Sequence, residues 1–173
     1  EAVVERQLAS CNVDPKMATS WLNKLAQAER PITALMLLHR LAAQGGLRYD
    51  VFHFGAAAAA CGQGAFWKEA GGLLEEMWQR GISQNAVVFG AAISACAACG
   101  RWKGAAGLLV DMGKKGIARN VVTDAAAINS CEKIGRWAEA LALLAGHGPE
   151  QLRRSIVAWN AAVSAGEKAG RWE

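Results

Sequence analysis

The sequence predicts an all-α fold, a right-handed α-solenoid of stacked antiparallel helical hairpins with one hairpin for each 35-residue repeat. The first observation is the tripeptide Gly-Arg-Trp, which stands at residues 100–102, 135–137 and 170–172, at the same interval both times. The second is that each interval contains two helical patterns of apolar residues. The third is composition, because 53% of the residues are hydrophobic and only three are proline, which favours helices.

The 35-residue period divides the chain into six segments. Alignment of the sequence with itself at this spacing matches core-type residues as well as the tripeptide. The first full repeat needs one additional residue near Gln44-Gly45-Gly46. The predicted segments are the tail of a preceding repeat (1–14), four full repeats (15–50, 51–85, 86–120 and 121–155) and the first helix of a further repeat (156–173).

The first helix of each repeat is predicted from apolar or small residues at the spacing that lines one helix face. Asp124 is a polar intrusion, because it takes the slot of Phe54 and Phe89, and the sequence indicates no partner for it. The predicted face includes Ala18, Trp21, Leu22 and Leu25; Phe54, Ala57, Ala58 and Cys61; Phe89, Ala92, Ile93 and Cys96; and Trp159, Ala162, Val163 and Gly166.

The tripeptide lies at the joint between the two helices of a hairpin. Its glycines, represented by Gly100, suit the left-handed residue that ends a helix, and its tryptophans, represented by Trp102, begin the next helix. In the first full repeat Pro31 takes the place of Trp, which fits the first turn of a helix. Because a single hairpin cannot bury both of its apolar sides, the repeats are expected to stack around a continuous core.

Composition and residue spacing speak against several classes of function. The net charge of +4 permits a polyanionic partner without requiring one, and the odd count of five cysteines indicates a reducing compartment. The apolar runs are too short to span a bilayer. We expect no catalytic residue, metal or cofactor, since Cys96 and Cys99 are interpreted as packing residues. The histidines occupy unrelated repeat positions and are interpreted as surface or incidental residues: His39, His53 and His147.

These residues together resemble the pentatricopeptide repeat family. A representative unit contains VVFGAAISAC, then GRW, then the alanines and leucines of a second helix, and it ends in Gly-Ile and Asn. The match in period and pattern extends over nearly the whole chain. The resemblance implies single-stranded RNA binding in a mitochondrion or plastid, with about one base read by each repeat.

The family places its base contacts at defined repeat positions, and the resemblance transfers them to this chain. The fifth and last residues of a repeat contact the base edge, and the second residue sandwiches the base. The implied edge contacts are Thr19 with Asp50, Asn85 in a pair with Gly55, Asn120 in a pair with Gly90, Ser155 in a pair with Ala125, and Asn160. The implied sandwiching residues are Lys16, Phe52, Val87, Val122 and Val157.

These pairs differ in what they offer chemically. Thr19 and Asp50 form the combination that the family associates with guanine, whose N–H groups need acceptors. The fifth position carries no polar side-chain atom at Gly55, Gly90 and Ala125. The last position also has a structural interpretation, because Asp, Asn and Ser are favoured helix N-caps. That interpretation fits Asp14, Asp50, Asn85, Asn120 and Ser155.

Basic residues recur along the repeats and are candidates for phosphate contact. They also suit solvated helix ends, where positive charge complements the helix dipole. The candidates are Arg101, Lys133, Arg136, Lys168 and Arg171.

The leading hypothesis from the sequence is therefore a repeat array that binds single-stranded organellar RNA in RNA processing, stability or translation. The alternative is a non-catalytic scaffold or accessory subunit of an organellar complex, such as a ribosome or a bioenergetic or photosynthetic assembly. The empty fifth positions motivate this alternative.

Overall fold

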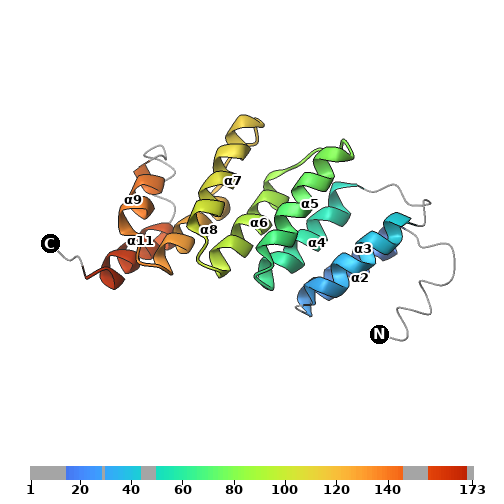
Figure 1. Ribbon diagram of the computed structural model, residues 1–173, viewed down its shortest axis with the longest axis horizontal. Helices are drawn as coiled ribbons and strands as arrows, with labels where there is room; N and C mark the ends of the chain where they lie inside the picture. The colour runs from blue at the N-terminus through green and yellow to red at the C-terminus, as the bar shows by residue number, and fades with distance from the viewer. Residues whose placement is uncertain (1–14, 29, 44–49, 146–155, 171–173) are drawn as a thin grey trace.

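The computed structural model describes residues 15–28, 30–43, 50–145 and 156–170. In this part of the chain every regular element is an α-helix, and the helices follow one another along a single row (Figure 1). The hairpins are α2 (Pro15–Gln27) with α3 (Pro31–Ala43), α4 (Val51–Gln63) with α5 (Trp67–Gln79), α6 (Ala86–Ala98) with α7 (Trp102–Lys114), and α8 (Val121–Glu132) with α9 (Trp137–Ala145); α11 (Ile156–Lys168) follows.

The helices form two layers, which we call first helices (α2, α4, α6, α8 and α11) and second helices (α3, α5, α7 and α9). Each first helix packs on the next first helix, and these are the most extensive contacts between elements. Each second helix packs on its own first helix and on the following one. Because the first helices are the more closely spaced, their layer forms the inner side of the stack.

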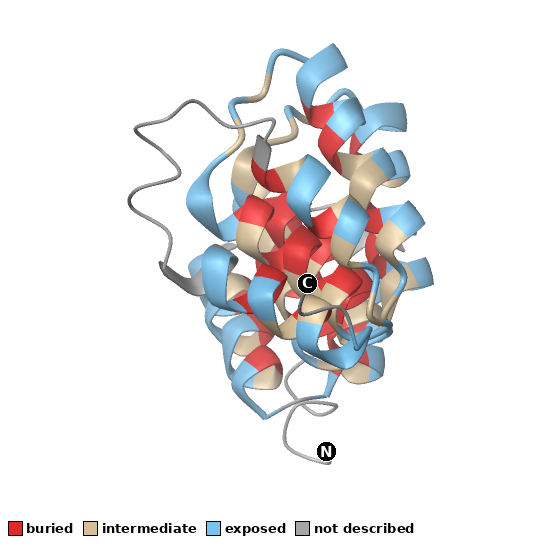
Figure 2. Cartoon of the chain, turned by 90° about the vertical axis from the view of Figure 1, so that its left-hand side faces the viewer, coloured by how far each residue is buried: buried red, intermediate tan, exposed pale blue. Residues whose placement is uncertain are grey.

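The core is the space enclosed by three helices at a time. Buried residues gather in the interior between the layers, while exposed residues cover the outside (Figure 2). Alanines such as Ala57 and Ala60 are fully buried and allow the first helices to approach closely. At Gly62 the approach is so close that an added Cβ would lie 2.9 Å from the backbone oxygen of Ala91 on the next first helix.

Two of the face residues predicted from the sequence are exposed. Trp159 and Val163 on α11 are 47% and 54% exposed, although Phe89 and Ile93 at the same repeat positions are buried. In the earlier repeats a second helix and a following first helix cover these positions. Among the described residues no helix follows α11, so the side chains that would cover this face are not part of the described chain.

The joints have the backbone conformation that the tripeptide predicts. Gly100, Gly135 and Gly170 all have left-handed backbone, with φ of 64°, 65° and 66°. Trp67, Trp102 and Trp137 each begin a second helix, and Pro31 begins α3. In repeat 51–85 the glycine position holds Ala65, which adopts the same conformation at φ 60°. This alanine is strained, because its Cβ crowds the backbone there.

The buried polar residue Asp124 has a partner that precedes its helix. Arg119, two residues before α8 begins, donates from Nε to Asp124 Oδ1 at 2.8 Å, and its Nη2 lies 2.7 Å from the same oxygen. The Asp124 side chain is 5% exposed and that of Arg119 is 33% exposed. The carboxylate in a phenylalanine slot is thus stabilised by a guanidinium that reaches in from the inter-repeat loop.

Ala65→Gly is expected to stabilise the fold by about 0.5–1 kcal/mol, because it removes left-handed strain at the joint while adding some unfolded-state entropy. Urea unfolding monitored by circular dichroism measures the difference. Gly81→Ala is the matched control, since Gly81 has φ 66° and an added Cβ would meet nothing within 4 Å; it should destabilise by a similar amount. An Ala65→Gly protein no more stable than the parent would contradict the strain argument.

Arg119→Leu is expected to cost about 1–3 kcal/mol, because it leaves the buried Asp124 carboxylate without its ion pair. The figure is reduced from that of a fully buried pair since Arg119 is partly solvated. The double variant Arg119→Leu/Asp124→Leu should recover most of the loss, because an apolar residue suits this slot. Equal unfolding midpoints for the parent and Arg119→Leu would show that the pair does not stabilise the repeat.

Candidate functional site

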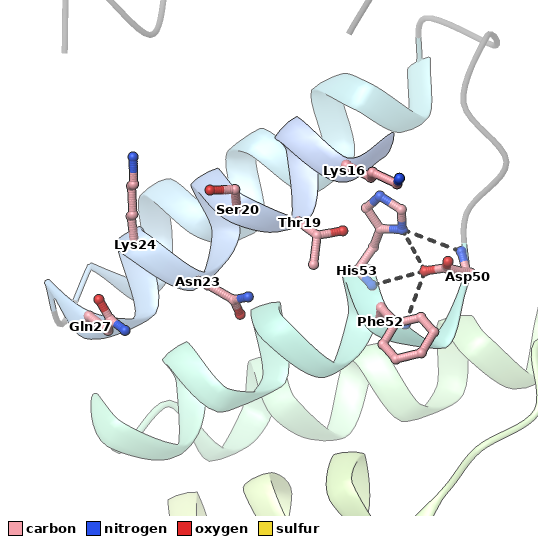
Figure 3. A pocket seen from close by; sticks show the side chains of 9 residues that line it. All are labelled: Lys16, Thr19, Ser20, Asn23, Lys24, Gln27, Asp50, Phe52 and His53. Carbon is pink, nitrogen blue, oxygen red and sulfur yellow. Dashed lines mark hydrogen bonds and ion pairs between the residues drawn. The ribbon is translucent and has the colours of Figure 1, made fainter. Parts of the chain in front are cut away.

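The candidate site is a groove along the inner side of the stack, between neighbouring first helices. Near α2 and α4 it is lined by Lys16, Thr19, Asp50 and Phe52, together with further polar residues of α2 (Figure 3). Near α6 and α8 it is lined by Val87, Gly90, Asn120 and Val122. In each pocket, the predicted base-sandwiching residues of two neighbouring repeats lie on either side of one predicted pair of edge-contacting residues. The fold therefore brings together the residues that the repeat register predicts to act on one base.

A row of exposed apolar side chains follows this groove, one in each of three successive repeats. Phe52, Val87 and Val122 are 69%, 65% and 66% exposed, although each lies in the first turn of a first helix, next to buried residues. Exposed apolar side chains at a regular interval on an inner surface indicate contact with an extended ligand that has flat apolar faces.

The last residue of each described repeat acts as a helix N-cap. Asp50 Oδ1 accepts from Phe52 N at 3.0 Å and His53 N at 3.2 Å. Asn85 Oδ1 accepts from the backbone N–H groups of residues 87 and 88, and Asn120 Oδ1 accepts from Thr123 N at 2.9 Å. The sequence prediction of capping is confirmed at these three positions, while Asp14 and Ser155 lie outside the described residues.

Capping determines which atom of each side chain is left for a ligand. The carbonyl oxygen of a capping Asn is used by the backbone, so Asn85 and Asn120 offer their N–H₂ groups, which are donors. Asp50 retains a carboxylate oxygen, which is an acceptor. Burial alone would raise the pKa of Asp50, but the hydrogen bonds from His53 and Phe52 lower it below its ordinary value. The carboxylate is therefore ionised at neutral pH.

The fifth positions of these repeats are open. A Cβ added at Gly55 would meet nothing within 4 Å, and one at Gly90 would meet only Thr123 Cγ2, at 3.6 Å. Their lack of a polar group is therefore a property of the sequence and not a requirement of packing. Asn160 is exposed in the first half of α11, and Val157, like Ser155, belongs to the part of the chain for which no side-chain description is given.

The residues predicted to contact phosphates lie at or just after the C-terminal ends of the first helices. Arg101 and Arg136 directly precede second helices, and Lys133 and Lys168 lie at the C-terminal ends of α8 and α11. The pockets between the first helices extend toward this end, since Lys24 and Gln27 line one of them and Gly62 and Gln63 line another. Arg171 lies outside the described residues.

Each of the four cations that the structure describes has a partner within the chain. The Arg101 guanidinium lies 3.6 Å from the centre of the Trp67 ring, and that of Arg136 lies 4.6 Å from the Trp102 ring. Each stack joins one repeat to the preceding one. Lys133 donates to the backbone oxygen of Ala98 at 2.8 Å, and Lys168 pairs with Glu132 at 3.0 Å. A role in phosphate binding stays a prediction for these residues.

The burial of the cysteines and histidines agrees only in part with the sequence prediction. Cys61, Cys96 and Cys131 are buried in the core, and burial raises the pKa of the Cys61 thiol to about 12, which leaves it unreactive. The interpretation of Cys99 as a packing residue was wrong, because Cys99 is exposed and its Sγ donates to the backbone oxygen of Ala65 at the preceding joint. Among the described residues no group of three side chains is arranged to hold a metal ion. The interpretation of His53 as a surface residue was wrong, because it is 1% exposed and contacts Asp50. His39 is exposed, and His147 lies outside the described residues.

The fold and groove define a class, that of helical-repeat solenoid proteins. The family model of the PPR repeat matches residues 87–117. This match covers one repeat of the chain, and the chain shares its fold with solved pentatricopeptide repeat proteins. None of the helices in the described ranges combines the length and apolarity needed to cross a membrane.

Two solved structures share this fold. One is the pentatricopeptide repeat protein PPR10 in complex with an 18-nucleotide psaJ RNA element, with a TM-score of 0.76 and 22% identity over 97% of this chain and 25% of that chain. The other is PPR10 from maize, with a TM-score of 0.69 and 23% identity over 92% of this chain and 28% of that chain. The chain thus spans about a quarter of the length of these proteins. No curated protein matches the chain by sequence.

Gly55→Ala is expected to stabilise the fold by about 0.5–1 kcal/mol, because alanine replaces a flexible glycine within a helix where the space is open. Gly62→Ala, on the same helix, should instead destabilise by about 1–3 kcal/mol, because its Cβ would press on the backbone of α6. Urea unfolding of both variants measures the contrast. Two variants of equal stability would contradict the close packing of α4 on α6 and the openness of the groove.

Proposed function

We propose that this chain binds single-stranded RNA along the groove of its first helices, with about one base for each repeat. The observation that carries the proposal is the row of exposed apolar side chains at Phe52, Val87 and Val122. Base–side-chain stacking is tolerant of sequence because every base has an apolar face. The PPR10 structure with RNA supports the proposal, because that protein shares the fold.

The cap residues would supply the hydrogen bonds to base edges. In the first described repeat, Thr19 and ionised Asp50 offer acceptors, which suit the N–H groups of guanine. In the next two, Asn85 and Asn120 offer donors, which suit ring nitrogen acceptors such as adenine N1. The fourth repeat contributes Ala125, which reads no edge by itself, and Asn160 favours a pyrimidine. With parallel polarity, the preferred ligand is G, A, A, any base, then a pyrimidine.

The proposal extends to the biological setting that the family resemblance implies. We propose a role in the processing, stability or translation of RNA in a mitochondrion or plastid, without catalysis by the described residues. A second candidate is a scaffold or accessory subunit of an organellar ribosome or bioenergetic or photosynthetic assembly. The observation that favours it is the absence of a polar group at Gly55, Gly90 and Ala125.

Phe52→Ala is expected to weaken RNA binding by about fivefold or more, because it removes the aromatic platform beside the first edge pair. Fluorescence anisotropy with a labelled RNA that contains GAAUC measures the change, and affinity should also fall with rising salt. The matched control is Trp78→Ala, since Trp78 is similarly exposed, at 65%, but lies on second helix α5.

The outcomes of this experiment separate the two candidate functions. Tight binding of the GAAUC RNA and weaker binding of its scrambled version support base reading in the groove. Absent binding, or equal effects of the two substitutions, would overturn the proposal and favour the scaffold. Co-purification with a defined complex that persists after nuclease treatment would then identify that complex.

A further inference from the structure

His53 is the third residue of α4, and it is the buried neighbour of the cap residue Asp50. Its side chain is 1% exposed, while that of Asp50 is 51% exposed. His53 Nδ1 lies 2.7 Å from Asp50 Oδ1. Both residues line the groove beside Thr19 and Phe52, as Figure 3 shows. A buried imidazole thus supports an exposed carboxylate at one end of the candidate site.

The chemistry of the pair determines the position of one proton. An ionised carboxylate can only accept, so the contact at 2.7 Å requires a hydrogen on Nδ1 of His53. Nδ1 cannot then accept from the Asp50 backbone N–H, which lies 3.5 Å away. The imidazole is therefore a donor to the cap side chain rather than an acceptor from the cap backbone.

All of the described hydrogen bonds to the Asp50 carboxylate go to the same oxygen. Oδ1 accepts from two backbone N–H groups and from His53 Nδ1. The imidazole adds a third donor, which lies on a buried ring. The orientation of the carboxylate plane is therefore fixed, and Oδ2 is the oxygen left to accept from a ligand.

In the next two repeats, the third residue of the first helix does not donate a hydrogen bond to the side chain of the cap residue. Val88 has no polar side chain, so Asn85 is held by backbone N–H groups alone. Thr123 donates from Oγ1 to the backbone oxygen of Asn120, at 2.8 Å, and not to its side chain. Of the three first-helix caps that the structure describes, Asp50 is the one whose side chain is held by the side chain of the third helix residue.

We infer that His53 is a positioning residue for base selection: it holds Asp50 so that Oδ2 faces the groove as an acceptor for a base that presents N–H groups, as guanine does. The inference rests on the proposed function and assigns the selectivity of the Thr19–Asp50 pair to a residue that does not touch the base. The low pKa of Asp50 agrees with this, because the His53 hydrogen bond stabilises the charged form.

The test compares His53→Val with His53→Asn. Valine is the residue at this position in the next repeat and removes the donor, whereas the Asn side-chain N–H₂ occupies nearly the place of Nδ1–H. Anisotropy titrations use two RNAs that differ only in G or A opposite the first pair. His53→Val should lower the preference for G by about fivefold or more, with the affinity for the A-containing RNA unchanged, and His53→Asn should retain most of the preference.

A double-mutant comparison excludes a general structural effect. In an Asp50→Asn background, His53→Val should leave the G-to-A ratio unchanged, since the acceptor that His53 holds is gone. Loss of affinity for both RNAs alike, or an unchanged ratio in His53→Val with Asp50 present, would overturn the inference. Circular dichroism melting checks that each variant is folded.

A measurement without RNA separates this inference from the proposed function. The pKa of the Asp50 carboxyl, followed by carbon-detected NMR titration, should rise in His53→Val and remain low in His53→Asn. An unchanged pKa in His53→Val would overturn the inference even if the protein binds RNA. A raised pKa in a protein that binds no RNA would instead show that the His53–Asp50 pair exists and that the proposed function fails.

Discussion

The structure depends on the packing of successive first helices on one another, which encloses α4, α6 and α8 between two other first helices. A helix enclosed in this way, with second helices against it as well, has only one narrow side left for solvent. Small side chains are required where the helices meet, which is why Ala57 and Ala60 are fully buried and why Gly62 cannot gain a Cβ without displacing Ala91. Equivalent positions in successive repeats lie on this free side, as Phe52, Val87 and Val122 do.

That constraint gives the cap residues two roles. A first helix must begin where the chain returns from the outer layer, and its free N–H groups need an acceptor at that point. Asp50, Asn85 and Asn120 supply it from positions that also border the groove. Because the backbone always takes one oxygen, the choice between Asp and Asn decides whether an acceptor or a donor remains. In the proposed function, helix capping and ligand selection therefore use the same side chain but different atoms.

The joints lie at the opposite end of the first helices, where the chain turns into the second helix of each hairpin. The left-handed residue turns the chain, the tryptophan begins the second helix, and the following repeat's arginine covers that ring, as Arg101 does on Trp67. These stacks connect successive repeats at the end of the first helices that is opposite their N-caps. The tripeptide that reveals the period is thus part of the connection between repeats and is separate from the reading positions.

Local pattern was sufficient for much of this protein. The helix pairs, the left-handed glycines, the buried cysteines and the caps at Asp50, Asn85 and Asn120 follow from periodicity and from the preferences of single residues, and those depend on neighbours a few positions away. The repeat register also indicated which residues share a groove, because a solenoid repeats its geometry. Those parts of the fold and candidate site were predictable from sequence.

Other features depended on the tertiary structure, because burial is set by residues distant in the sequence. His53 lacks a periodic counterpart, and only the packing of α2 and α4 makes it a buried support for Asp50. Asp124 sits in an apolar slot because Arg119 can reach it, while Trp159 is exposed because no described helix covers α11. The sequence by itself determined the repeating hairpin and its register, since these arise from local interactions. Only the tertiary structure decided which side chains are enclosed, which atoms remain free and which cations already have partners, because those outcomes require neighbouring repeats to be in contact.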